Sequence, residues 1–521
     1  MAVVEVSPIK SVNTPLTSQA DPCVVIILGA SGDLTRRKLV PALFDLNTVG
    51  ALPEEFQLLG VGQEAMSDVE FRALVREGTA SSRDVNEFQE DGWNGFAPRL
   101  MYMQGNLMES ATYVKIAKRL EEMSRAGASS NRLFYFSTPP SLAPSIIKGL
   151  HEAALAKEEK GWTRIIVEKP FGHDLASAQD LNTQIAQAFN EHQVYRIDHY
   201  LGKETVRNIL VFRFGNSLFE PVWNRNYIDY VEITAVETLG IGSRAGYYEE
   251  AGALRDMMAN HLLQLLTLTA MEPPVAFDAD SVREEKVQIL RSIRPMKHEE
   301  VAKRVVRGQY GTGRIEGTEV PAYRNENGVA NDSITETYVA VEFLIENWRW
   351  AGVPFYVRTG KRLAEPLTEI AIHLKRTPQA LFARYDRKQR IEPNVIVLRI
   401  QPSEGITVSF DAKLPGTEMD TGTVEMNFCY RTAFGMTGPA AYETLLLDAM
   451  QGDATLFKRR DEVEAEWRLI MPIKEAWGKE PAPDFPNYAA GSNGPVAADE
   501  LLARNDHTWR FINSNTGRCS E

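Results

Sequence analysis

The order of apolar runs along the chain constrains the fold more than any other feature of the sequence. From Cys23 to about residue 198, short apolar stretches alternate with helical stretches of ten or more residues. The apolar stretches are CVVIIL, FQLLGVG, NRLFYF, TRIIV and QVYRID, and the helical stretches include residues 110–125 and 141–158. This alternation predicts an α/β fold, namely a doubly wound parallel sheet of the Rossmann type.

The pattern changes after residue 198. Stretches of strand character then follow one another without long helices between them: YVEITAVE, AIHLKR, NVIVLRIQP, GITVSFDAKL and TVEMNFCY. Helical patches at residues 203–213, 248–270 and 440–452 accompany them. Strands in direct succession favour antiparallel pairing, so we expect an α+β domain with a large, mainly antiparallel sheet.

The two patterns predict two domains, which the length of 521 residues also favours. We expect a first domain at residues 22–199 and a second at residues 200–521. Residues 1–21 are rich in Ser, Thr and Pro and lack apolar periodicity, which predicts a flexible leader.

Composition limits the partners of the chain. The net charge of −13 opposes non-specific attraction to nucleic acid and to anionic membranes, so a phosphate site has to be a local cluster of cations. The three cysteines (Cys23, Cys429 and Cys519) are scattered and contain no CxxC pair, which suggests neither a disulfide framework nor a zinc site. No signal-peptide pattern and no apolar run of about 20 residues occurs, so we expect a cytoplasmic protein without membrane contact.

A glycine-containing turn follows the first predicted strand directly, in VVIILGASGDL. Glycine permits a tight turn and lets backbone N–H groups approach a pyrophosphate, which the helix N-terminus then attracts. The spacing departs from the full dinucleotide fingerprint, because Ala30 and Thr35 stand where glycines would be. A strand-to-helix turn that binds nothing is the alternative. The expected coenzyme contacts in this turn are Gly29, Ser31, Gly32, Asp33 and Leu34.

The end of the second predicted strand is where dinucleotide-binding proteins distinguish the two nicotinamide coenzymes. An acidic residue there accepts the ribose 2′-OH of NAD, whereas an arginine accommodates the 2′-phosphate of NADP. This chain has Gln63 and Glu64 at that place. Arg36, Arg37 and Lys38 are near in sequence, but they also fit the exposed face of the first helix.

The segment YRIDHYLGKE joins the two patterns and concentrates polar side chains. Asp198 and His199 come just after a predicted parallel strand, where open α/β sheets bind ligands. Lys203 offers a point charge, and His199 and Tyr200 offer hydrogen-bond donors, as a phosphate requires. Gly202 permits a turn into the next helix. A solvated charged turn is the alternative.

A second histidine lies on an apolar helical face, where the following residues share one side: Leu254, Met257, Met258, His261, Leu262 and Leu265. A buried histidine held by a hydrogen bond is the structural interpretation. The functional interpretation is a general base with a pKa near neutral, oriented by a carboxylate from elsewhere. Asp198 is a candidate for that carboxylate.

Two further lysines follow predicted strands or lie in glycine-flanked loops. Lys169 precedes Pro170 in IIVEKPFG, at a strand end where it can reach coenzyme or substrate oxygens. Lys361 lies in FYVRTGKRL of the second domain. Either lysine alone is also compatible with an exposed position, because lysines are mostly exposed.

Taken together, the motifs resemble the glucose-6-phosphate dehydrogenase family from about residue 23 to residue 510. The resemblance rests on GASGDL, EKPFG, RIDHYLGKE, GALRDMMANHLLQ and GVPFYVRTGK, and on later patterns around AYETLLLDAM and AGSNGP. It implies oxidation of C1 of glucose 6-phosphate with hydride transfer to NADP or NAD, in the oxidative pentose phosphate pathway. It also implies a homodimer or homotetramer joined through the sheet of the second domain, which would bind substrate and support oligomerisation.

The resemblance also implies roles for individual residues. His261 matches the general base, and Asp198 matches its partner carboxylate. The expected contacts to glucose 6-phosphate are His199, Tyr200, Lys203, Lys169, Glu237, Asp256 and Lys361. Lys169 and Pro170 are also expected beside the coenzyme, and no metal ligand is expected.

One departure from the family pattern bears on the coenzyme. Members that use NADP commonly have arginine where this chain has Gln63, and Glu64 would repel a 2′-phosphate. We therefore expect appreciable use of NAD. Another sugar oxidoreductase and a non-catalytic nucleotide-sensing homologue are the alternative functions; RIDHYLGKE argues against the first, and the joint presence of Asp198, Lys203 and His261 argues against the second.

Overall fold

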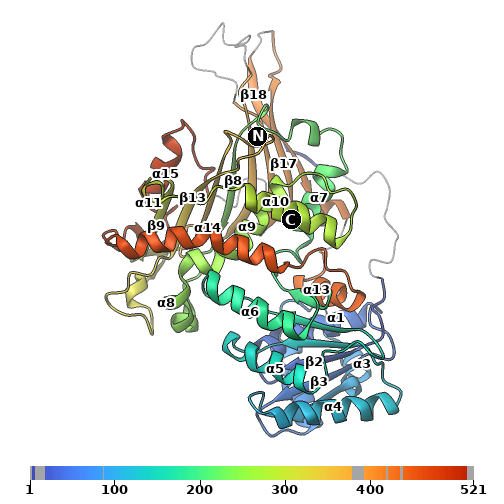
Figure 1. Cartoon of the computed structure of the whole chain (residues 1–521). Coiled ribbons are helices and arrows are strands. Elements are labelled where there is room, and N and C mark those ends of the chain that lie inside the picture. The colour runs from blue at the N-terminus through green and yellow to red at the C-terminus, as the bar shows by residue number, and fades with distance from the viewer. Residues whose placement is uncertain are drawn as a thin grey trace.

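The computed structural model describes residues 3–5, 18–85, 87–377, 392–417, 420–434 and 438–512. Figure 1 shows an N-terminal part, coloured blue to cyan, below a larger part that is coloured green to red. Each part is built around its own sheet. The helix α14 (Arg460–Lys479) runs across the region between them.

The first sheet has six strands in the order β4–β3–β2–β5–β6–β7, and every neighbouring pair is parallel. Its strands are β2 (Val24–Leu28), β3 (Gln57–Gly62), β4 (Leu100–Gln104), β5 (Arg132–Phe136), β6 (Thr163–Val167) and β7 (Val194–Arg196). The helices around it include η1 (Thr35–Leu39), α1 (Val40–Thr48), α2 (Asp68–Ala80), α3 (Glu90–Phe96), α4 (Ser110–Arg125), α5 (Ala143–Glu152) and α6 (Leu175–Ala188). This strand order is that of the Rossmann fold, so the predicted doubly wound parallel sheet is confirmed.

Local sequence explains how the second strand of this sheet is positioned beside the first. All five residues of β2 (VVIIL) are buried, as expected for a strand covered by helices on both faces. The helix after β3 begins with a capping box, in which Ser67 accepts a hydrogen bond from the Glu70 backbone and Glu70 accepts one from the Ser67 backbone. The carboxyl ends of β2 and β3 lie next to each other because the two strands pair in parallel, with Leu28 opposite Val61.

The second sheet has nine strands in the order β1–β18–β17–β16–β15–β8–β14–β13–β9. Its strands are β1 (Val3–Glu5), β8 (Ile228–Val236), β9 (Val305–Gly308), β13 (Tyr338–Leu344), β14 (Pro354–Gly360), β15 (Leu367–Leu374), β16 (Val395–Gln401), β17 (Gly405–Lys413) and β18 (Thr421–Cys429). Only the pairs β8–β14 and β1–β18 are parallel. The predicted mainly antiparallel sheet is therefore confirmed, although β13 and β14 do not stand out in the sequence.

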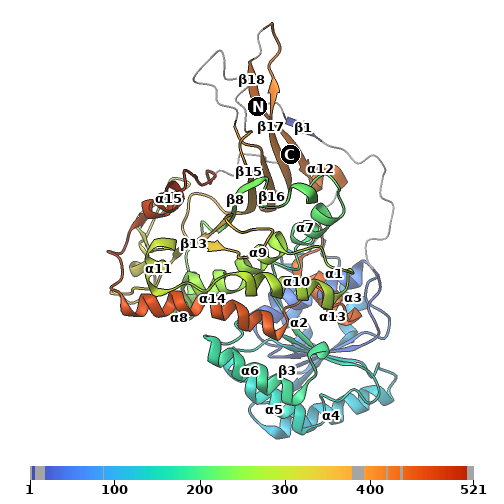
Figure 2. The ribbon, with the colours of Figure 1, turned by 45° about the horizontal axis from the view of Figure 1, so that its top comes forward.

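Helices cover one face of the second sheet (Figure 2). They include α7 (Glu204–Phe214), α8 (Ala245–Ala253), η7 (Leu254–Leu262), α9 (Leu263–Ala270), α10 (Ala279–Ser292) and α11 (His298–Arg304), with α14 packed against α10 and η7. The helices α12 (Tyr430–Phe434) and α15 (Val496–Ala503) complete this part, whereas α13 (Ala441–Gln451) packs against α1 of the N-terminal part. Val231, Ile233 and Ala235 of β8 share one apolar core with η7 and α9.

The stretch 248–270, which the sequence predicts as one helical patch, is divided into α8, the π-helical segment η7 and α9. Gly252 has φ 61°, and a Cβ at this position would lie 2.2 Å from Oε1 of Glu336. That Oε1 instead accepts a hydrogen bond of 3.0 Å from the Leu254 backbone. The glycine and the buried carboxylate therefore set where η7 begins.

The chain returns to the first sheet late in the sequence. The buried residues Leu445, Leu446 and Phe457 belong to the apolar core that also contains Val25 and Ile27 of β2. Figure 1 shows α13, coloured orange, beside α1 of the N-terminal part. The first sheet is therefore covered in part by residues of the last hundred positions.

Two other elements differ from the sequence prediction. The strand β1 lies within residues 1–21 and pairs with β18, whereas the sequence predicts no strand in that stretch. Three residues are too few to carry a recognisable pattern. The helix α5 ends at Glu152, shorter than the predicted stretch 141–158. Within the described ranges, none of the helices has the length and apolar character needed to cross a membrane.

Candidate active site

The predicted site residues gather where the first sheet meets η7. Lys169 and Asp198 follow the carboxyl ends of β6 and β7, the edge at which open α/β sheets bind ligands. Asp256 and His261 lie on η7, which comes from the other part of the chain. π-Helical turns are frequent at functional sites. The site thus lies between two sheets and is built by both.

His261 and Asp198 form a buried pair. Nδ1 of His261 contacts Oδ1 of Asp198, and both side chains are 1% exposed. The same carboxylate oxygen accepts a hydrogen bond of 3.0 Å from the Tyr200 backbone. With its proton on Nδ1, the neutral imidazole keeps a lone pair on Nε2. The pair therefore has the arrangement of a base oriented by a carboxylate.

Lys169 contacts Nε2 of His261, the ring nitrogen that Asp198 does not contact. Its Nζ is 2.9 Å from Nε2 of His261 and 3.2 Å from Oδ1 of Asp256. The carboxylate of Asp256 also accepts a hydrogen bond of 3.1 Å from the hydroxyl of Tyr247. Lys169 is followed by a cis peptide bond to Pro170. One ammonium group thus joins the histidine to a second carboxylate.

The environment determines which of these groups are charged. Burial lowers the pKa of His261 and the Lys169 charge lowers it further, while Asp198 opposes both effects only in part. Burial alone would raise the pKa of Asp198, but His261 and Lys458 outweigh it, so this pKa lies well below its ordinary value. The histidine is therefore neutral and the carboxylate ionised near neutral pH, which is the state that a general base requires.

The three polar residues after Asp198 surround the histidine. The His199 and His261 ring centroids are 4.5 Å apart, and Tyr200 stacks on His261 at 4.4 Å. Nζ of Lys203 lies 4.1 Å from the Tyr200 ring centroid. The structure therefore brings His199, Tyr200 and Lys203 together beside His261, an arrangement that fits a ligand site better than a solvated turn.

Charge in this group is carried by the lysine. Burial lowers the pKa of Lys203 to about 8, although Glu404, Asp198 and Glu237 oppose the effect. Burial also lowers the pKa of His199 well below its ordinary value, and the neighbouring His261 and Lys169 lower it further. His199 is therefore a neutral hydrogen-bonding group near neutral pH and does not add a cation.

Glu237 and Lys361 form an ion pair just beyond the carboxyl ends of two neighbouring strands of the second sheet. Glu237 follows β8 and Lys361 follows β14, so the parallel pairing of these strands puts the two side chains together. Lys361 is buried, whereas the side chain of Glu237 is 44% exposed. Burial raises the pKa of Asp256, but Lys169 and Lys361 lower it to about 2. Lys361 thus acts on the same charge cluster as Lys169.

The glycine turn has the geometry that the sequence predicts. Gly29 has φ 93°, and a Cβ there would lie 2.2 Å from the Ser137 carbonyl oxygen, so only glycine fits. The Gly32 backbone donates to the Gly29 carbonyl at 3.1 Å. Thr35 is buried, and its hydroxyl lies 3.1 Å from that of Ser137, so the residue at a usual glycine position serves packing. Leu34 directly precedes η1.

The end of β3 presents a carboxylate toward this turn. The Ser31 hydroxyl donates to the carboxylate of Glu64, which lowers the pKa of Glu64, and the Tyr102 hydroxyl donates to the Glu64 carbonyl at 2.7 Å. Gln63 contacts Asn106 at 3.5 Å. The glycine backbone, the helix terminus and the carboxylate at the end of β3 are features with which a sheet of this kind can hold a dinucleotide.

The nearby arginines are already paired. Nε of Arg37 lies 2.7 Å from Oδ1 of Asp33, and the Arg36 guanidinium lies 3.7 Å from it. Nζ of Lys38 lies 2.6 Å from Asp84. Asp33, which the sequence places among the coenzyme contacts, is thus engaged with the first helix, and the local excess of cations around the turn is small.

Sequence reasoning missed several residues around the site. Glu168 is buried beside Lys169, where the Tyr135 hydroxyl at 2.5 Å and the Tyr442 hydroxyl at 3.1 Å donate to it. Burial raises the pKa of Glu168, and these hydrogen bonds counteract the rise only in part. Tyr247 also escapes the sequence motifs. The EKP motif marks Glu168, but no local pattern connects it to Tyr442 of α13.

Ligand-type atoms of Asp198, His199 and His261 lie within 4.8 Å of one another, a spacing that a metal ion could use. The surrounding charges argue against that use. Lys169 contacts His261 directly, and both Lys169 and Lys203 act electrostatically on His199. A divalent cation here would be repelled by two lysines. The cluster is better suited to moving a proton and holding an anion.

Comparison with known proteins agrees with this arrangement. The family model described as "Glucose-6-phosphate dehydrogenase, NAD binding domain" matches residues 26–208, and "Glucose-6-phosphate dehydrogenase, C-terminal domain" matches residues 210–510. The chain is 47% identical over 496 residues to the glucose-6-phosphate 1-dehydrogenase of Aggregatibacter actinomycetemcomitans, which covers 94% of this chain and 98% of that protein.

Two solved structures resemble the whole chain. One, described as glucose-6-phosphate dehydrogenase in complex with its substrate glucose 6-phosphate, superimposes with a TM-score of 0.86 at 36% identity and covers 95% of this chain and 100% of that chain. The glucose-6-phosphate 1-dehydrogenase of Mycobacterium avium has a TM-score of 0.79 at 34% identity, over 94% and 99% of the two chains. Fold, sequence and family models coincide over both sheets, and the chain therefore belongs to the glucose-6-phosphate dehydrogenase family.

Proposed function

We propose that this chain oxidises C1 of glucose 6-phosphate to the 6-phospho-lactone and transfers the hydride to NAD or NADP, the first step of the oxidative pentose phosphate pathway. The observation that carries the proposal is the buried His261–Asp198 pair at the carboxyl edge of a Rossmann sheet. Asp198 contacts Nδ1 of His261, and Nε2 on the other side of the ring contacts Lys169. Membership of the family supports it, as does the relative that is described as a complex with this substrate.

His261 is the proposed general base. Nε2 takes the proton of the C1 hydroxyl while the C–H electron pair leaves as hydride, and the oxygen lone pair completes the new C=O bond. Asp198 holds the Nδ1 proton and stabilises the imidazolium that forms. The nicotinamide ring, when bound, supplies the hydride acceptor. Such a base contributes typically ~10²–10⁴-fold to the rate.

The polar residues around His261 are proposed to bind the substrate. Lys203 supplies a charge for the phosphate, and His199 and Tyr200 supply hydrogen-bond donors. Lys361 and Glu237, which are paired in the free chain, exchange that contact for contacts with the substrate. Asp256 and Lys169 hold the sugar end near the base. The phosphate is a dianion over most of the working pH range, so Lys203 contributes a charge-assisted hydrogen bond.

The coenzyme is proposed to bind at the turn after β2 and the end of β3. The residues assigned to it are Gly29, Ser31, Gly32, Asp33, Leu34, Gln63, Glu64, Lys169 and Pro170. Backbone N–H groups of the turn suit the pyrophosphate, because the η1–α1 helix begins there.

Initial rates with glucose 6-phosphate and either coenzyme test the function and the coenzyme preference together. We expect reduction of both coenzymes, with kcat/KM for NAD comparable to or higher than that for NADP, because the ionised Glu64 repels a 2′-phosphate and can accept the 2′-OH. Absence of any coenzyme reduction contradicts the proposed function. A kcat/KM more than about a hundredfold higher for NADP contradicts the preference alone, since this ratio corresponds to roughly 2.7 kcal/mol of discrimination.

The Glu64→Gln variant tests whether Glu64 causes the preference for NAD over NADP. It should raise the NADP-to-NAD ratio of kcat/KM roughly tenfold, as removal of one exposed charge near a phosphate allows. Glu55→Gln is the matched control, because Glu55 is exposed and precedes β3 at its opposite end. An equal NADP-to-NAD ratio of kcat/KM in the two variants would show that Glu64 does not set the coenzyme preference.

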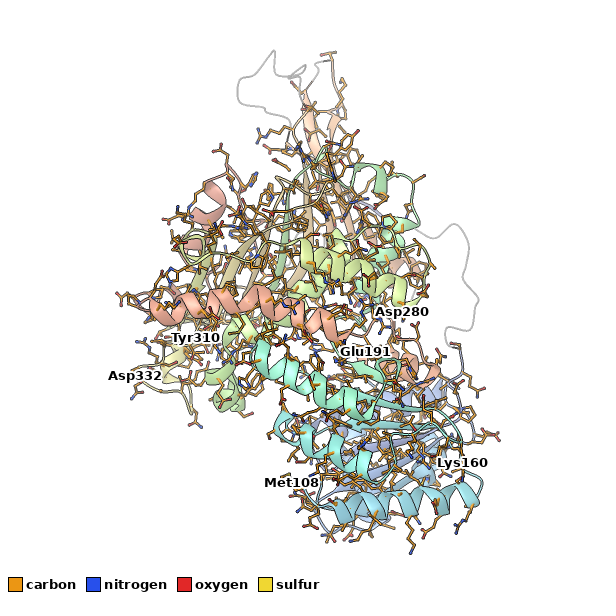
Figure 3. All side chains as sticks on the ribbon, viewed as in Figure 1. Met108, Lys160, Glu191, Asp280, Tyr310 and Asp332 are labelled. Atoms are coloured by element: carbon orange, nitrogen blue, oxygen red, sulfur yellow. The ribbon has the colours of Figure 1, made fainter. Side chains whose placement is uncertain are left out.

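The pH dependence of substrate capture follows from Lys203. Because burial lowers its pKa to about 8, the free chain loses this positive charge as the pH rises through that value. We expect kcat/KM for glucose 6-phosphate to fall above about pH 8, and the Lys203→Arg variant to shift this alkaline limb upward, since a guanidinium stays protonated. Lys160→Arg, at an exposed position of the N-terminal part (Figure 3), should leave the limb in place. An unshifted limb in Lys203→Arg would show that another group sets it.

An assembly of two or four copies through the second sheet, and a location in the cytoplasm, remain expectations from the family resemblance. The net charge of −13 likewise leaves us expecting neither nucleic acid nor membrane as a partner.

A further inference from the structure

A fully buried ionic cluster lies next to the elements that carry the His261–Asp198 pair. We call it the α14 cluster; its members are Gln264, Lys286, Lys458, Glu462 and Glu466. Each of them is at most 1% exposed. Charged side chains are almost never buried completely unless they are paired. The mechanism derived above uses none of these residues.

Within the α14 cluster, two ion pairs share one amide. Lys458 pairs with Glu466, and Lys286 pairs with Glu462 at 2.8 Å. The amide nitrogen of Gln264 lies 2.6 Å from Glu466 and 3.4 Å from Glu462. The cluster therefore holds two basic and two acidic side chains, and burial raises the pKa of Glu466 to about 7.

Lys458 connects the α14 cluster to both elements that carry the proposed catalytic pair. Its Nζ lies 3.4 Å from Oδ1 of Asn260, the neighbour of His261 on η7. Its backbone N–H donates to the Arg196 carbonyl at 3.1 Å, in a bridge at the end of β7 just before Asp198. Lys458, which lies between α13 and α14, thus contacts the neighbour of the base on η7 and the strand that ends before Asp198.

Further contacts attach the start of α14 to the N-terminal part near Lys458. Glu191 accepts a hydrogen bond of 3.0 Å from the Arg460 backbone and pairs with Arg196. Figure 3 shows Glu191 where α14 meets the N-terminal part. The indole of Trp467 donates to the Phe171 carbonyl at 3.0 Å, close to Lys169 in sequence. The start of α14 is therefore attached to the segments after both β6 and β7.

The second carboxylate oxygen of Asp198 lacks a hydrogen-bond donor within the part of the chain that the structure describes. One of its carboxylate oxygens, Oδ1, receives His261 and the Tyr200 backbone, whereas Oδ2 is buried and has no hydrogen-bond donor among the described residues. A buried carboxylate with one bare oxygen is costly unless a cation compensates it. Lys458 is among the charges that favour the ionised form of Asp198.

We propose that Lys458, paired with Glu466, is a positioning residue for the proton-transfer step: its side chain holds Asn260 of η7 and its backbone holds the end of β7, so that the base and its carboxylate partner stay in register. This inference rests on the proposed role of His261 as base. Lys458 acts only through Asp198 and Asn260, since it has no contact with His261 itself among the described interactions. Glu466 offsets the cost of burying the lysine, because an unpaired buried cation destabilises strongly.

Other charged groups around the pair enter the pH dependence. The groups that face Asp198 or His261 are Lys169, His199, Tyr200, Glu168, Asp256, Tyr442 and Lys458. Glu466 faces Lys458, Gln264 and Glu462. Removing Lys458 makes the potential at Asp198 more negative and favours protonated His261. Removing Glu466 should change little below about pH 7, because burial raises the pKa of this carboxyl group to about 7 and it is then already protonated.

The test is the acidic limb of kcat/KM in Lys458→Met and Glu466→Gln. We expect the limb to move to higher pH in the first variant, by about half to one pH unit, as a charge several ångströms away allows. It should stay in place in the second variant, because Glu466 has already lost its charge below about pH 7. The double variant should follow Lys458→Met. A shift from the lysine alone identifies an effect of its charge, because both variants break the same buried contact.

The second buried pair provides a matched control. Lys286→Met and Glu462→Gln remove an ion pair of equal burial that contacts neither Asn260 nor Arg196. These variants should lower the unfolding temperature but leave the acidic limb in place. Equal shifts in both pairs, or a limb that stays in place in Lys458→Met, would overturn the proposal.

A direct measurement separates this inference from the proposed function. The pKa of His261 can be followed by NMR of the histidine-labelled full chain, with His261→Asn for assignment. It should rise in Lys458→Met and stay unchanged in Glu466→Gln even if the chain proves inactive on glucose 6-phosphate. If the chain is active but the His261 pKa in Lys458→Met equals that of the unaltered chain, the proposed function stands and the role of Lys458 is wrong.

Discussion

Replacing His261 by asparagine is expected to lower kcat about 10²–10⁴-fold while KM for glucose 6-phosphate changes little. The amide can replace the imidazole in its contact with Asp198 but cannot accept the substrate proton, so only an interaction of the transition state is lost. Steady-state kinetics with glucose 6-phosphate over a range of pH provide the measurement.

His199→Asn is the comparison for this variant, because His199 is the adjacent ring at 4.5 Å from His261. As a neutral donor to the phosphate, His199 should affect KM more than kcat. If His261→Asn kept its kcat, or if both variants changed kcat equally, His261 would not be the base.

The second large effect is expected for Asp198→Asn. An asparagine retains an acceptor for the Tyr200 backbone but presents no negative charge to the imidazolium that forms during proton transfer. The equivalent change in the Ser-His-Asp triad of a serine protease lowers kcat by about 10⁴-fold. We expect a loss of kcat on the order of 10²–10⁴-fold in this chain, with a smaller change in KM.

Asp256→Asn is the contrasting variant, since Asp256 is linked to His261 through Lys169. Its main effect should be on KM. Thermal unfolding of both variants controls for misfolding, because both carboxylates are buried. A kcat in Asp198→Asn within about tenfold of the unaltered chain would mean that the carboxylate does not support the base.

Several parts of the fold follow from local sequence. The apolar run of β2 is buried on both faces, as a parallel strand should be, and the strand–helix alternation predicts the first sheet. Gly29 is required by a left-handed turn with no room for a Cβ, which the motif GASGDL indicates. The positions of Lys169 and Asp198 after strands place them at one sheet edge, because parallel strands end on the same side.

Other parts depend on contacts between distant segments. The sequence marks 248–270 as helical, but Glu336 and Gly252 together divide it, and no periodicity carries such a contact. The strand β1 pairs with β18 although the chain between them is long. Glu237 and Lys361 meet only because β8 and β14 pair in parallel.

The sequence by itself thus determined the fold class, the edge of the first sheet that carries the site, and the residue types that the chemistry needs, since each depends on local pattern and on strand direction. Only the tertiary structure decided which nitrogen of His261 is free, that His199 is neutral, and that Lys458 reaches Asn260 and Arg196 from the far end of the chain. The physical reason is that protonation and hydrogen-bond direction depend on burial and on neighbouring charges, and these neighbours come from segments whose separation in sequence carries no signal of their contact.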